Sequence, residues 1–339
     1  MLWISSPGKL YEIFPDIFEQ RIVSKMMATT WRKQSLIIGL CVFSIITTLV
    51  NKHVLSDLRF TYPTVFQSWQ TGTVAMVLLS LNVLGYIEIT FLPVTSTTLA
   101  SWLPASVLYS GIIYSGSVAL SRLPVPVFCA MCYLKTLLVA LLESFIFKKE
   151  PSTNSQFSLI FTAIATVSVA GTDVQFDQMG YKWLMIHCGL SAIYVYYGKS
   201  QNKNSLNDLD KLFYNAIVSV IVLMGISVLT GELYKIIEFP FLYSTHFHLG
   251  CMGSGIFGAA LGLIRVSLLD TEVSYSLGII DSLNKVAISF LSLFIFDVTL
   301  DSNMAVSIIA VLCSGVLYSY TVTVQEEAEQ RTAHPVRDS

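Results

Sequence analysis

Hydrophobic residues in this chain gather in ten long runs that are separated by short polar stretches. A membrane-spanning helix needs about 20 mostly apolar residues, whereas a strand of a membrane barrel shows about ten residues of alternating polarity. The continuous runs therefore predict an all-α polytopic membrane protein with ten transmembrane helices. The predicted helices cover Ser35–Leu55, Val65–Ile87, Thr98–Leu120, Val125–Phe147, Phe157–Thr172, Trp183–Tyr197, Leu212–Thr230, Leu249–Ile264, Val273–Phe296 and Ala305–Tyr320.

Composition agrees with a membrane location. Hydrophobic residues make up 54% of the 339 positions and charged residues 12%, and the mean hydropathy is +0.66. A water-soluble chain usually spends about a quarter of its residues on charge, because its core needs a polar shell. The 20 basic and 22 acidic residues leave a net charge of −2. The expected partner is therefore the lipid bilayer and not a nucleic acid.

The basic residues of the connecting segments predict the orientation, because cytosolic loops carry an excess of Lys and Arg. With the N-terminus in the cytosol, 13 basic residues fall on the cytosolic side and 4 on the other, and an even number of helices returns the C-terminus to the cytosol. We expect a cytosolic N-terminal extension at 1–34, a ten-helix transporter domain at 35–322 and a cytosolic C-terminal tail at 323–339. The cytosolic set is Lys9, Arg21, Lys25, Arg32, Lys33, Lys148, Lys149, Lys199, Lys203, Lys211, Arg265, Arg331 and Arg337, and the opposite set is Arg59, Arg122, Lys182 and Lys235.

The fourth and ninth predicted helices resemble one another. Lys135 is followed ten residues later by the sequence Phe145–Phe147, and Lys285 is followed nine residues later by the matching sequence Phe294–Phe296. Helices four and nine are five apart, so they cross the membrane in opposite directions. This pattern predicts a five-plus-five inverted repeat, in which the binding site lies near the midplane between the two halves.

Charged residues within the predicted spans are few: Lys52, Lys135, Glu143, Asp281 and Lys285. Each costs about 2.5–3.5 kcal/mol at the centre of a membrane helix, so each should face the interior of the bundle. Lys135 and Lys285, deep in apolar sequence at equivalent repeat positions, predict an anion site. Two structural explanations stay open, namely that Lys52 reaches the nearby interface and that the other lysines form Lys–Glu and Lys–Asp pairs.

Polar residues accompany Lys285. In the ninth helix Asp281, Ser282 and Asn284 precede it, so an amide and an ammonium group are available to a phosphorylated solute. The seventh helix opens with Phe213, Tyr214 and Asn215. An aromatic ring can stack on a base, and an amide offers a donor and an acceptor to a base edge.

Signals for catalysis are weak. Cys129-x-x-Cys132 lies in an apolar run without a second pair, and His246-x-His248 has no third ligand nearby. The chain contains no phosphate-binding glycine loop, no nucleophile elbow and no zinc-protease motif. We therefore expect a protein that is not an enzyme and needs no cofactor or metal.

The segments Phe213–Ala216 and Ser282–Lys285 resemble motifs of the nucleotide-sugar transporters of the drug/metabolite transporter superfamily, in particular the Golgi GDP-mannose transporters. That group carries Phe-Tyr-Asn-Asn in helix seven and Gly-Ala-Leu-Asn-Lys in helix nine. The likeness includes Asn51-Lys52, the Lys135 helix and the ten-helix layout. The chain is most similar to a divergent animal branch, the transmembrane protein 241 group. The resemblance implies substrate contacts at Tyr214, Asn215, Asn284 and Lys285. We expect the substrate site to include Lys52, Lys135, Asp281 and Ser282 as well.

Two departures from the GDP-mannose motifs bear on the solute. Ala216 replaces the second asparagine of the first motif, and Asp281 replaces the glycine of the second. Losing an amide where guanine is read favours a UDP-sugar, UDP-N-acetylglucosamine first, and Asp281 could accept a hydrogen bond from the sugar. The resemblance implies a Golgi antiporter that exchanges a cytosolic nucleotide sugar for a lumenal nucleoside monophosphate.

Other functions stay open from the sequence. They are a GDP-mannose transporter, a carrier of phosphorylated sugars, and a receptor or chaperone with the same fold that transports nothing. The sequence leaves undecided whether two copies associate as a homodimer.

Overall fold

The computed structural model describes residues 15–90, 96–147, 151–201, 206–269, 277–296, 298 and 300–333. Within these ranges it is built from helices, and no residue is in a strand. The main α-helices are α2 (Pro15–Lys52), α3 (Pro63–Val83), α4 (Ser96–Arg122), α5 (Val125–Met131), α6 (Tyr133–Phe147), α7 (Thr153–Thr172), α8 (Gln178–Ser200), α9 (Asp208–Thr230), α11 (Thr245–Leu269), α12 (Leu277–Ile295) and α13 (Ser302–Ala333). A π-helical turn (His53–Asp57) follows α2, and the short α10 (Glu232–Lys235) follows α9.

Each of the ten predicted hydrophobic runs overlaps one of these helices, so the prediction of an all-α polytopic membrane protein is confirmed. Eight helical stretches of the described chain are long and apolar enough to cross a membrane. The helices α3 and α8, of 21 and 23 residues, match predicted runs but lie outside that set. The fourth run is broken, because a turn at Cys132 separates α5 from α6.

Local sequence signals explain several helix ends. Pro63 begins α3, where its missing N–H has no partner to lose. The Ser152 hydroxyl accepts a hydrogen bond from the Ser155 backbone N–H at the start of α7. Gly231 ends α9 with φ of 75°, a left-handed conformation that suits glycine.

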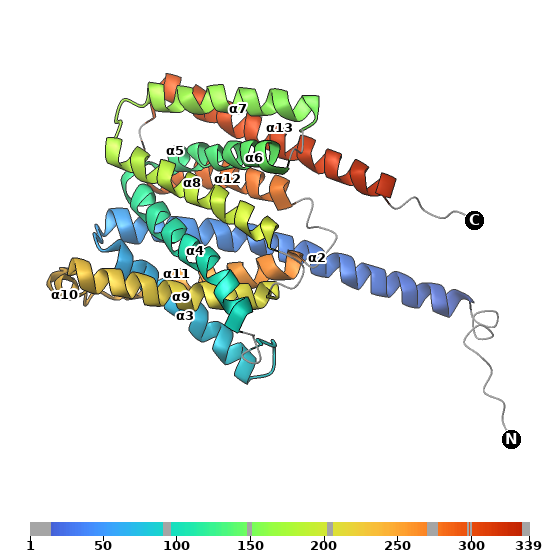
Figure 1. Cartoon of the computed structure of the whole chain (residues 1–339), viewed down its shortest axis with the longest axis horizontal. Helices are drawn as coiled ribbons and strands as arrows, with labels where there is room; N and C mark the ends of the chain where they lie inside the picture. The colour runs from blue at the N-terminus through green and yellow to red at the C-terminus, as the bar shows by residue number, and fades with distance from the viewer. Residues whose placement is uncertain are drawn as a thin grey trace.

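The helices run roughly alongside one another, and the projecting N-terminal part of α2 and C-terminal part of α13 lie at the same end of the bundle (Figure 1). We call this end the termini end and the other end, where α10 lies, the distal end. The helices α7 and α13 form a pair on one side of the bundle. The predicted boundaries at residues 34 and 322 both fall within continuous helices, α2 and α13.

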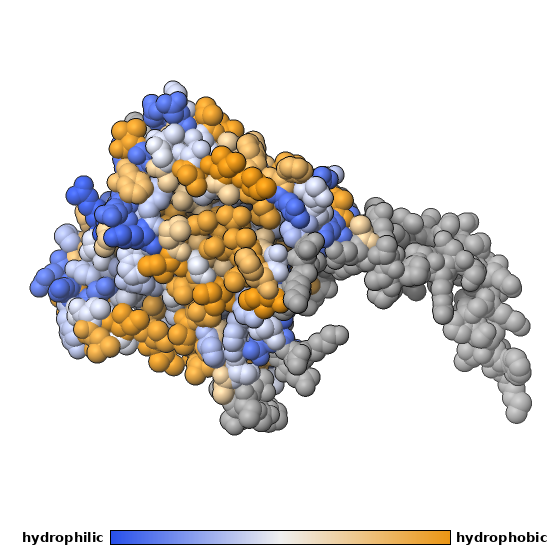
Figure 2. Space-filling model, turned by 45° about the horizontal axis from the view of Figure 1, so that its top comes forward, coloured by the Kyte–Doolittle hydropathy of each residue, from blue (hydrophilic) through white to orange (hydrophobic). Residues whose placement is uncertain are grey.

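The outer surface of the bundle is apolar, as a bilayer requires. Figure 2 shows hydrophobic residues over most of the middle of one face, with hydrophilic residues gathered mainly toward the distal end. Large apolar side chains such as Phe157, Val167 and Phe294 are exposed on the helices. In a soluble protein so large an apolar surface would promote association, whereas lipid can cover it.

The interior contains many small polar residues beside its apolar ones. Hydroxyl groups of buried Ser and Thr return their hydrogen bonds to the backbone one turn earlier, as Ser110 does to Ser106 and Thr166 to Thr162. Small residues allow close helix contact: a Cβ on Gly255 of α11 would lie 2.6 Å from Cβ of Thr73 in α3. Small residues at these contacts let the helices pack closely around the polar side chains of the interior.

An ion pair ties α4 to α8 at the distal end. The Arg122 guanidinium donates a 3.2 Å hydrogen bond to Asp177, whose side chain also accepts from the Met179 backbone N–H at 3.0 Å. Burial works to raise the pKa of Asp177, but the hydrogen bonds from Arg122 and from the Met179 and Gly180 backbones lower it below its ordinary value. The pair therefore fixes the start of α8 beside the end of α4.

The shared position of the two ends predicts a result for tagged protein. Epitope tags at both termini should become accessible to antibody under the same condition. Since positive residues favour the cytosol, that condition should be permeabilisation of the plasma membrane alone. A tag at one end that stains only after all membranes are permeabilised would contradict the arrangement of α2 and α13.

Candidate functional site

Lys285 on α12 lies against an aromatic ring held by two other helices. Its ammonium nitrogen is 3.9 Å from the ring centroid of Tyr133, a cation–π contact. The Tyr133 hydroxyl donates a 3.3 Å hydrogen bond to the Ser282 carbonyl oxygen. A Cβ on Gly315 of α13 would come within 2.1 Å of the Tyr133 ring. Only glycine therefore leaves room for the ring that positions Lys285.

The two lysines predicted to form an anion site lie near each other. The ammonium groups of Lys135 and Lys285 are within electrostatic range, and no carboxylate within the described parts of the chain forms an ion pair with either. The amide oxygen of Asn284 is buried and has no hydrogen-bond partner there. Ser282 exchanges a hydroxyl hydrogen bond with Ser319 of α13. Lys135 and Lys285 thus form an electropositive group, and Asn284, the residue before Lys285, carries an unused acceptor; we call these three residues the lysine cluster.

The predicted Lys–Glu and Lys–Asp pairs are not those observed. Glu143 of α6 bonds to Lys199 of α8, and Asp281 accepts two hydrogen bonds from Arg265 of α11, at 3.1 and 2.9 Å. The structural explanation for Lys135 and Lys285 therefore loses its proposed partners. Asp281 engages a residue that the sequence did not single out as part of the site.

Asn215 forms a second polar group, on α9. Its amide oxygen accepts from the Trp102 indole N–H at 3.1 Å and from the Ser106 hydroxyl at 2.8 Å. Its amide nitrogen donates to the Tyr194 hydroxyl at 2.9 Å. The ring of Tyr214 packs beside Trp102 and Tyr194 in the same cluster. The predicted base-reading residues are thus together, and the three bonds of the Asn215 amide to α4 and α8 leave one of its two N–H groups available.

A cavity of about 300 Å³ lies inside the bundle and is lined by residues of α2, α3, α4, α5, α8 and α11. Tyr109 on its wall packs against Tyr194, with ring centroids 6.0 Å apart, and so adjoins the Asn215 group. Phe128 and His187 adjoin the α5–α6 side, with ring centroids 5.9 Å apart. The wall mixes polar and apolar residues; the polar ones are Thr47, Thr48, Asn51, Gln67, Gln70, Thr71, Tyr109, Ser117 and His187, and most of the apolar ones belong to α3, α4 and α11.

Lys52 bonds to the end of α4, where Leu120 lines this cavity. Its ammonium group, 7% exposed, donates hydrogen bonds of 2.9 Å to the carbonyl oxygens of Leu120 and Leu123 at the end of α4. A cation suits this position, because the last carbonyls of a helix are unpaired and carry negative partial charge. Lys52 is therefore neither free nor snorkelling; it links α2 to α4, while Gln67 links α3 to Ser117 of α4.

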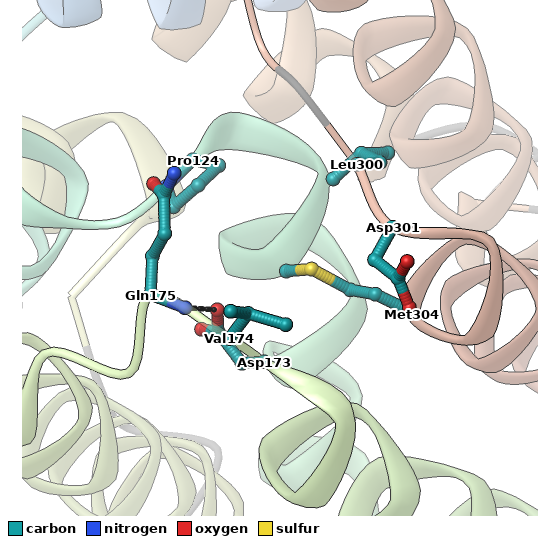
Figure 3. A pocket seen from close by; sticks show the side chains of 7 residues that line it. All are labelled: Pro124, Asp173, Val174, Gln175, Leu300, Asp301 and Met304. Atoms are coloured by element: carbon teal, nitrogen blue, oxygen red, sulfur yellow. Dashed lines mark hydrogen bonds between the residues drawn. The ribbon is translucent and has the colours of Figure 1, made fainter.

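A separate pocket at the distal end is unrelated to the predicted site. Figure 3 shows that it is lined by residues that follow α4 and α7 and that precede or begin α13. The Asp173 carboxylate accepts from the Gln175 backbone and from the Tyr181 hydroxyl, and Asp301 accepts from the Asn303 backbone. These carboxylates serve local turns and helix starts, and no cluster of metal-ligating side chains exists within the described chain.

Sequence reasoning missed the residues that support the predicted ones. Tyr133, Gly315, Trp102, Tyr194 and Arg265 carry no motif of their own, because aromatic and glycine residues are common in membrane helices. Their roles depend on contacts between helices far apart in the chain. The basic sequence Lys148-Lys149 that supported the repeat lies outside the described residues.

Comparison with known proteins shows extended similarity to transporters. The chain is 36% identical over 270 residues to the UDP-N-acetylglucosamine transporter TMEM241 homolog of Xenopus laevis, covering 80% of this chain and 90% of the relative. It is 36% identical over 269 residues to UDP-N-acetylglucosamine transporter TMEM241 of Mus musculus, with 79% and 90% covered. The GDP-mannose transporter GONST1 of Arabidopsis thaliana is 24% identical over 287 residues, with 82% and 86% covered.

Two further comparisons concern the family and the fold. No protein-family model matches the chain. One crystal structure of a protein has a TM-score of 0.54 at 13% identity, covering 85% of this chain and 98% of the other, which is a likeness of fold alone. A multi-pass helical bundle with eight helical stretches able to cross a membrane, similar over most of its length to named transporters, is a membrane transporter. The chain belongs to the nucleotide-sugar transporter family, whose named members are transporters and not enzymes.

The position of Gly315 leads to a prediction. Gly315→Ala should displace the Tyr133 ring and destabilise the protein by about 1–3 kcal/mol, because the added methyl has no space. Gly189→Ala on α8 is the matched control, since nothing lies within 4 Å of its Cβ position. Thermal unfolding of the purified protein should show a lower midpoint for Gly315→Ala alone. Equal midpoints would show that the ring does not need this space.

Proposed function

We propose that this protein is a Golgi antiporter that carries a cytosolic nucleotide sugar inward and returns a lumenal nucleoside monophosphate. The observation that supports this most is the lysine cluster. Two half-buried ammonium groups that form no ion pair with a carboxylate of the described chain are costly in an empty membrane protein, and a bound phosphate would compensate them. The buried Asn284 oxygen, which lacks a partner among the described residues, would accept a hydroxyl or N–H group of the same solute.

Exchange follows from the same electrostatics. Moving the site from one side of the membrane to the other requires that the charges leave water for a closed interior. Either anion neutralises the lysines and lowers this barrier, whereas an empty site keeps it high. A ligand can shift such an equilibrium only through its different affinity for the two states, so the nucleotide sugar and the monophosphate would each drive one direction.

The packing of the helices supports ten spans in a five-plus-five inverted repeat. Exchanging α2 with α8, α3 with α9, α4 with α11, α5–α6 with α12, and α7 with α13 converts one packing pair into another. The pair α4–α8 becomes α11–α2, α4–α9 becomes α11–α3, and α6–α8 becomes α12–α2, all of which are present. The pairs α3–α9, α7–α13 and α5–α12 convert into themselves and are also present. Such symmetry is the basis of alternating access by rocking of one half against the other.

The relatives and Ala216 favour a UDP-sugar, with UDP-N-acetylglucosamine first. The relatives that are 36% identical are named as transporters of that compound. Ala216 is 2% exposed and packs in an apolar cluster with Val74 and Ala259, so α9 offers one amide, that of Asn215, at the base end. Guanine has more donors to satisfy than uracil, and an unpaired buried polar group costs about 1–3 kcal/mol.

GDP-mannose remains the second candidate, because named GDP-mannose transporters also align over most of the chain. A receptor or chaperone that transports nothing would not require the lysine cluster to stay free of carboxylates. A carrier of phosphorylated sugars would not require the aromatic group around Asn215. Both are therefore less well supported than nucleotide-sugar exchange.

The anion site predicts the effect of removing Lys285. Lys285→Ala should reduce exchange in proteoliposomes at least roughly tenfold, since truncating one member of a buried charge pair costs about 2–5 kcal/mol. Lys285→Arg should retain little, because a planar fork replaces a compact ammonium group. Lys182→Ala, an exposed lysine of α8, should leave exchange unchanged. Normal uptake by Lys285→Ala would contradict the site.

A counterflow assay tests the solute. Proteoliposomes loaded with UMP should take up UDP-N-acetylglucosamine faster than vesicles loaded with GMP take up GDP-mannose. The reason is the single available amide at the base end and the apolar surroundings of Ala216. If the protein exchanges GMP for GDP-mannose and ignores UMP, the preference for uridine is wrong and nucleotide-sugar exchange stands.

A further inference from the structure

The Arg265–Asp281 ion pair lies at the termini side of the central cavity. Arg265 is one helical turn beyond Leu261, which lines the cavity on α11. Its guanidinium is within electrostatic range of the Tyr109 hydroxyl, which also lines the cavity. Asp281 is one turn before Lys285 on α12 and within electrostatic range of it. The pair therefore lies one turn from a residue of the cavity wall on α11 and one turn from Lys285 on α12.

The pair has the geometry with which arginine binds phosphate. The two guanidinium nitrogens each donate to one carboxylate oxygen of Asp281, at 3.1 and 2.9 Å. This paired arrangement is also how a guanidinium binds two oxygens of a phosphate group. The side chains are 48% and 36% exposed, so the pair is accessible and weak compared with a buried one.

We propose that Arg265 binds the phosphate groups of the nucleotide sugar and of the nucleoside monophosphate, and that Asp281 occupies its guanidinium only while the transporter is empty. The inference rests on the proposed function and adds a third cation to it. A phosphate dianion carries more charge than a carboxylate and offers oxygens in the same paired geometry, so it can displace Asp281.

Asp281 then acts as a competitor of the solute and not as a sugar contact. Its carboxylate selects against neutral sugars and nucleosides, because these have no charge with which to replace it at Arg265. A phosphorylated solute replaces Asp281 at Arg265 and can then contact Lys285, which lies one turn further into the bundle. Asp281, which departs from the GDP-mannose motif, would thus set how much negative charge a solute needs in order to bind Arg265.

Substitutions at the two positions separate this role from a structural one. A structural ion pair loses the same interaction when either member is neutralised, so Arg265→Gln and Asp281→Asn should act in the same direction. If Asp281 competes with the solute for Arg265, the two substitutions should change solute binding in opposite directions. The Arg122–Asp177 pair is a matched control, because it also joins an arginine and an aspartate of different helices, with exposures of 47% and 33%.

The experiment measures binding of UMP, with inorganic pyrophosphate and uridine as further probes, to the purified full-length protein. Arg265→Gln should weaken UMP binding at least roughly tenfold, Asp281→Asn should tighten it about threefold or more, and the double variant should resemble Arg265→Gln. Uridine should show neither effect. Arg122→Gln and Asp177→Asn should change thermal stability and leave UMP binding unaltered.

Two results would overturn the inference. If wild-type protein exchanges nucleotide sugar for UMP, but Arg265→Gln and Asp281→Asn leave UMP binding unchanged or shift it in the same direction, the pair is structural and the proposed function stands. If the wild-type protein binds none of UMP, GMP and CMP, the proposed function and the role of Arg265 both fail.

Discussion

Half-buried positive charge inside the bundle, held without an ion-paired carboxylate of the described chain, is the constraint on which this structure depends. Lys135 and Lys285 lie within electrostatic range of each other, and each costs about 2.5–3.5 kcal/mol within a membrane. A protein that needed only a stable bundle could pair each with an acid, and the chain has acids on the same helices. Glu143 and Asp281 are nevertheless bound elsewhere, to Lys199 and Arg265. Both acids thus have other ion-pair partners, which leaves the ammonium groups of Lys135 and Lys285 for a solute.

Holding such charges in place requires rigid, non-ionic support. The Tyr133 ring supplies it for Lys285, and Gly315 makes the space for the ring. Lys52 shows the opposite solution, because its ammonium group is satisfied by two backbone carbonyls of α4. Lys52 therefore stabilises the contact between α2 and the end of α4. Lys135 and Lys285 remain available for function. All three residues are lysines, so the difference comes from what the ammonium group contacts. Lys52 contacts backbone carbonyls, and Lys285 contacts an aromatic ring.

The sequence predicted the helices well, because continuous apolar runs are a strong and local signal. It also predicted that Lys135, Lys285 and Asn284 would share a site, since the repeat places them on equivalent helices. It could not predict that Asn215 bonds to Trp102, Ser106 and Tyr194, because these contacts join α9 to α4 and α8. The break at Cys132 was likewise invisible, as the residues on both sides are apolar.

The assignment of Lys52 and Asp281 shows where motif reasoning reaches its limit. Both were expected to touch the solute, one from a resemblance and one from its spacing before Lys285. The structure gives each a strong partner within the protein, but of different kinds. The bonds of Lys52 are buried and join backbone carbonyls, so breaking them would expose the end of α4. The bonds of Asp281 are half-exposed and join a guanidinium that phosphate also binds. Exposure and the chemistry of the partner therefore distinguish a fixed support from a contact that a solute can replace.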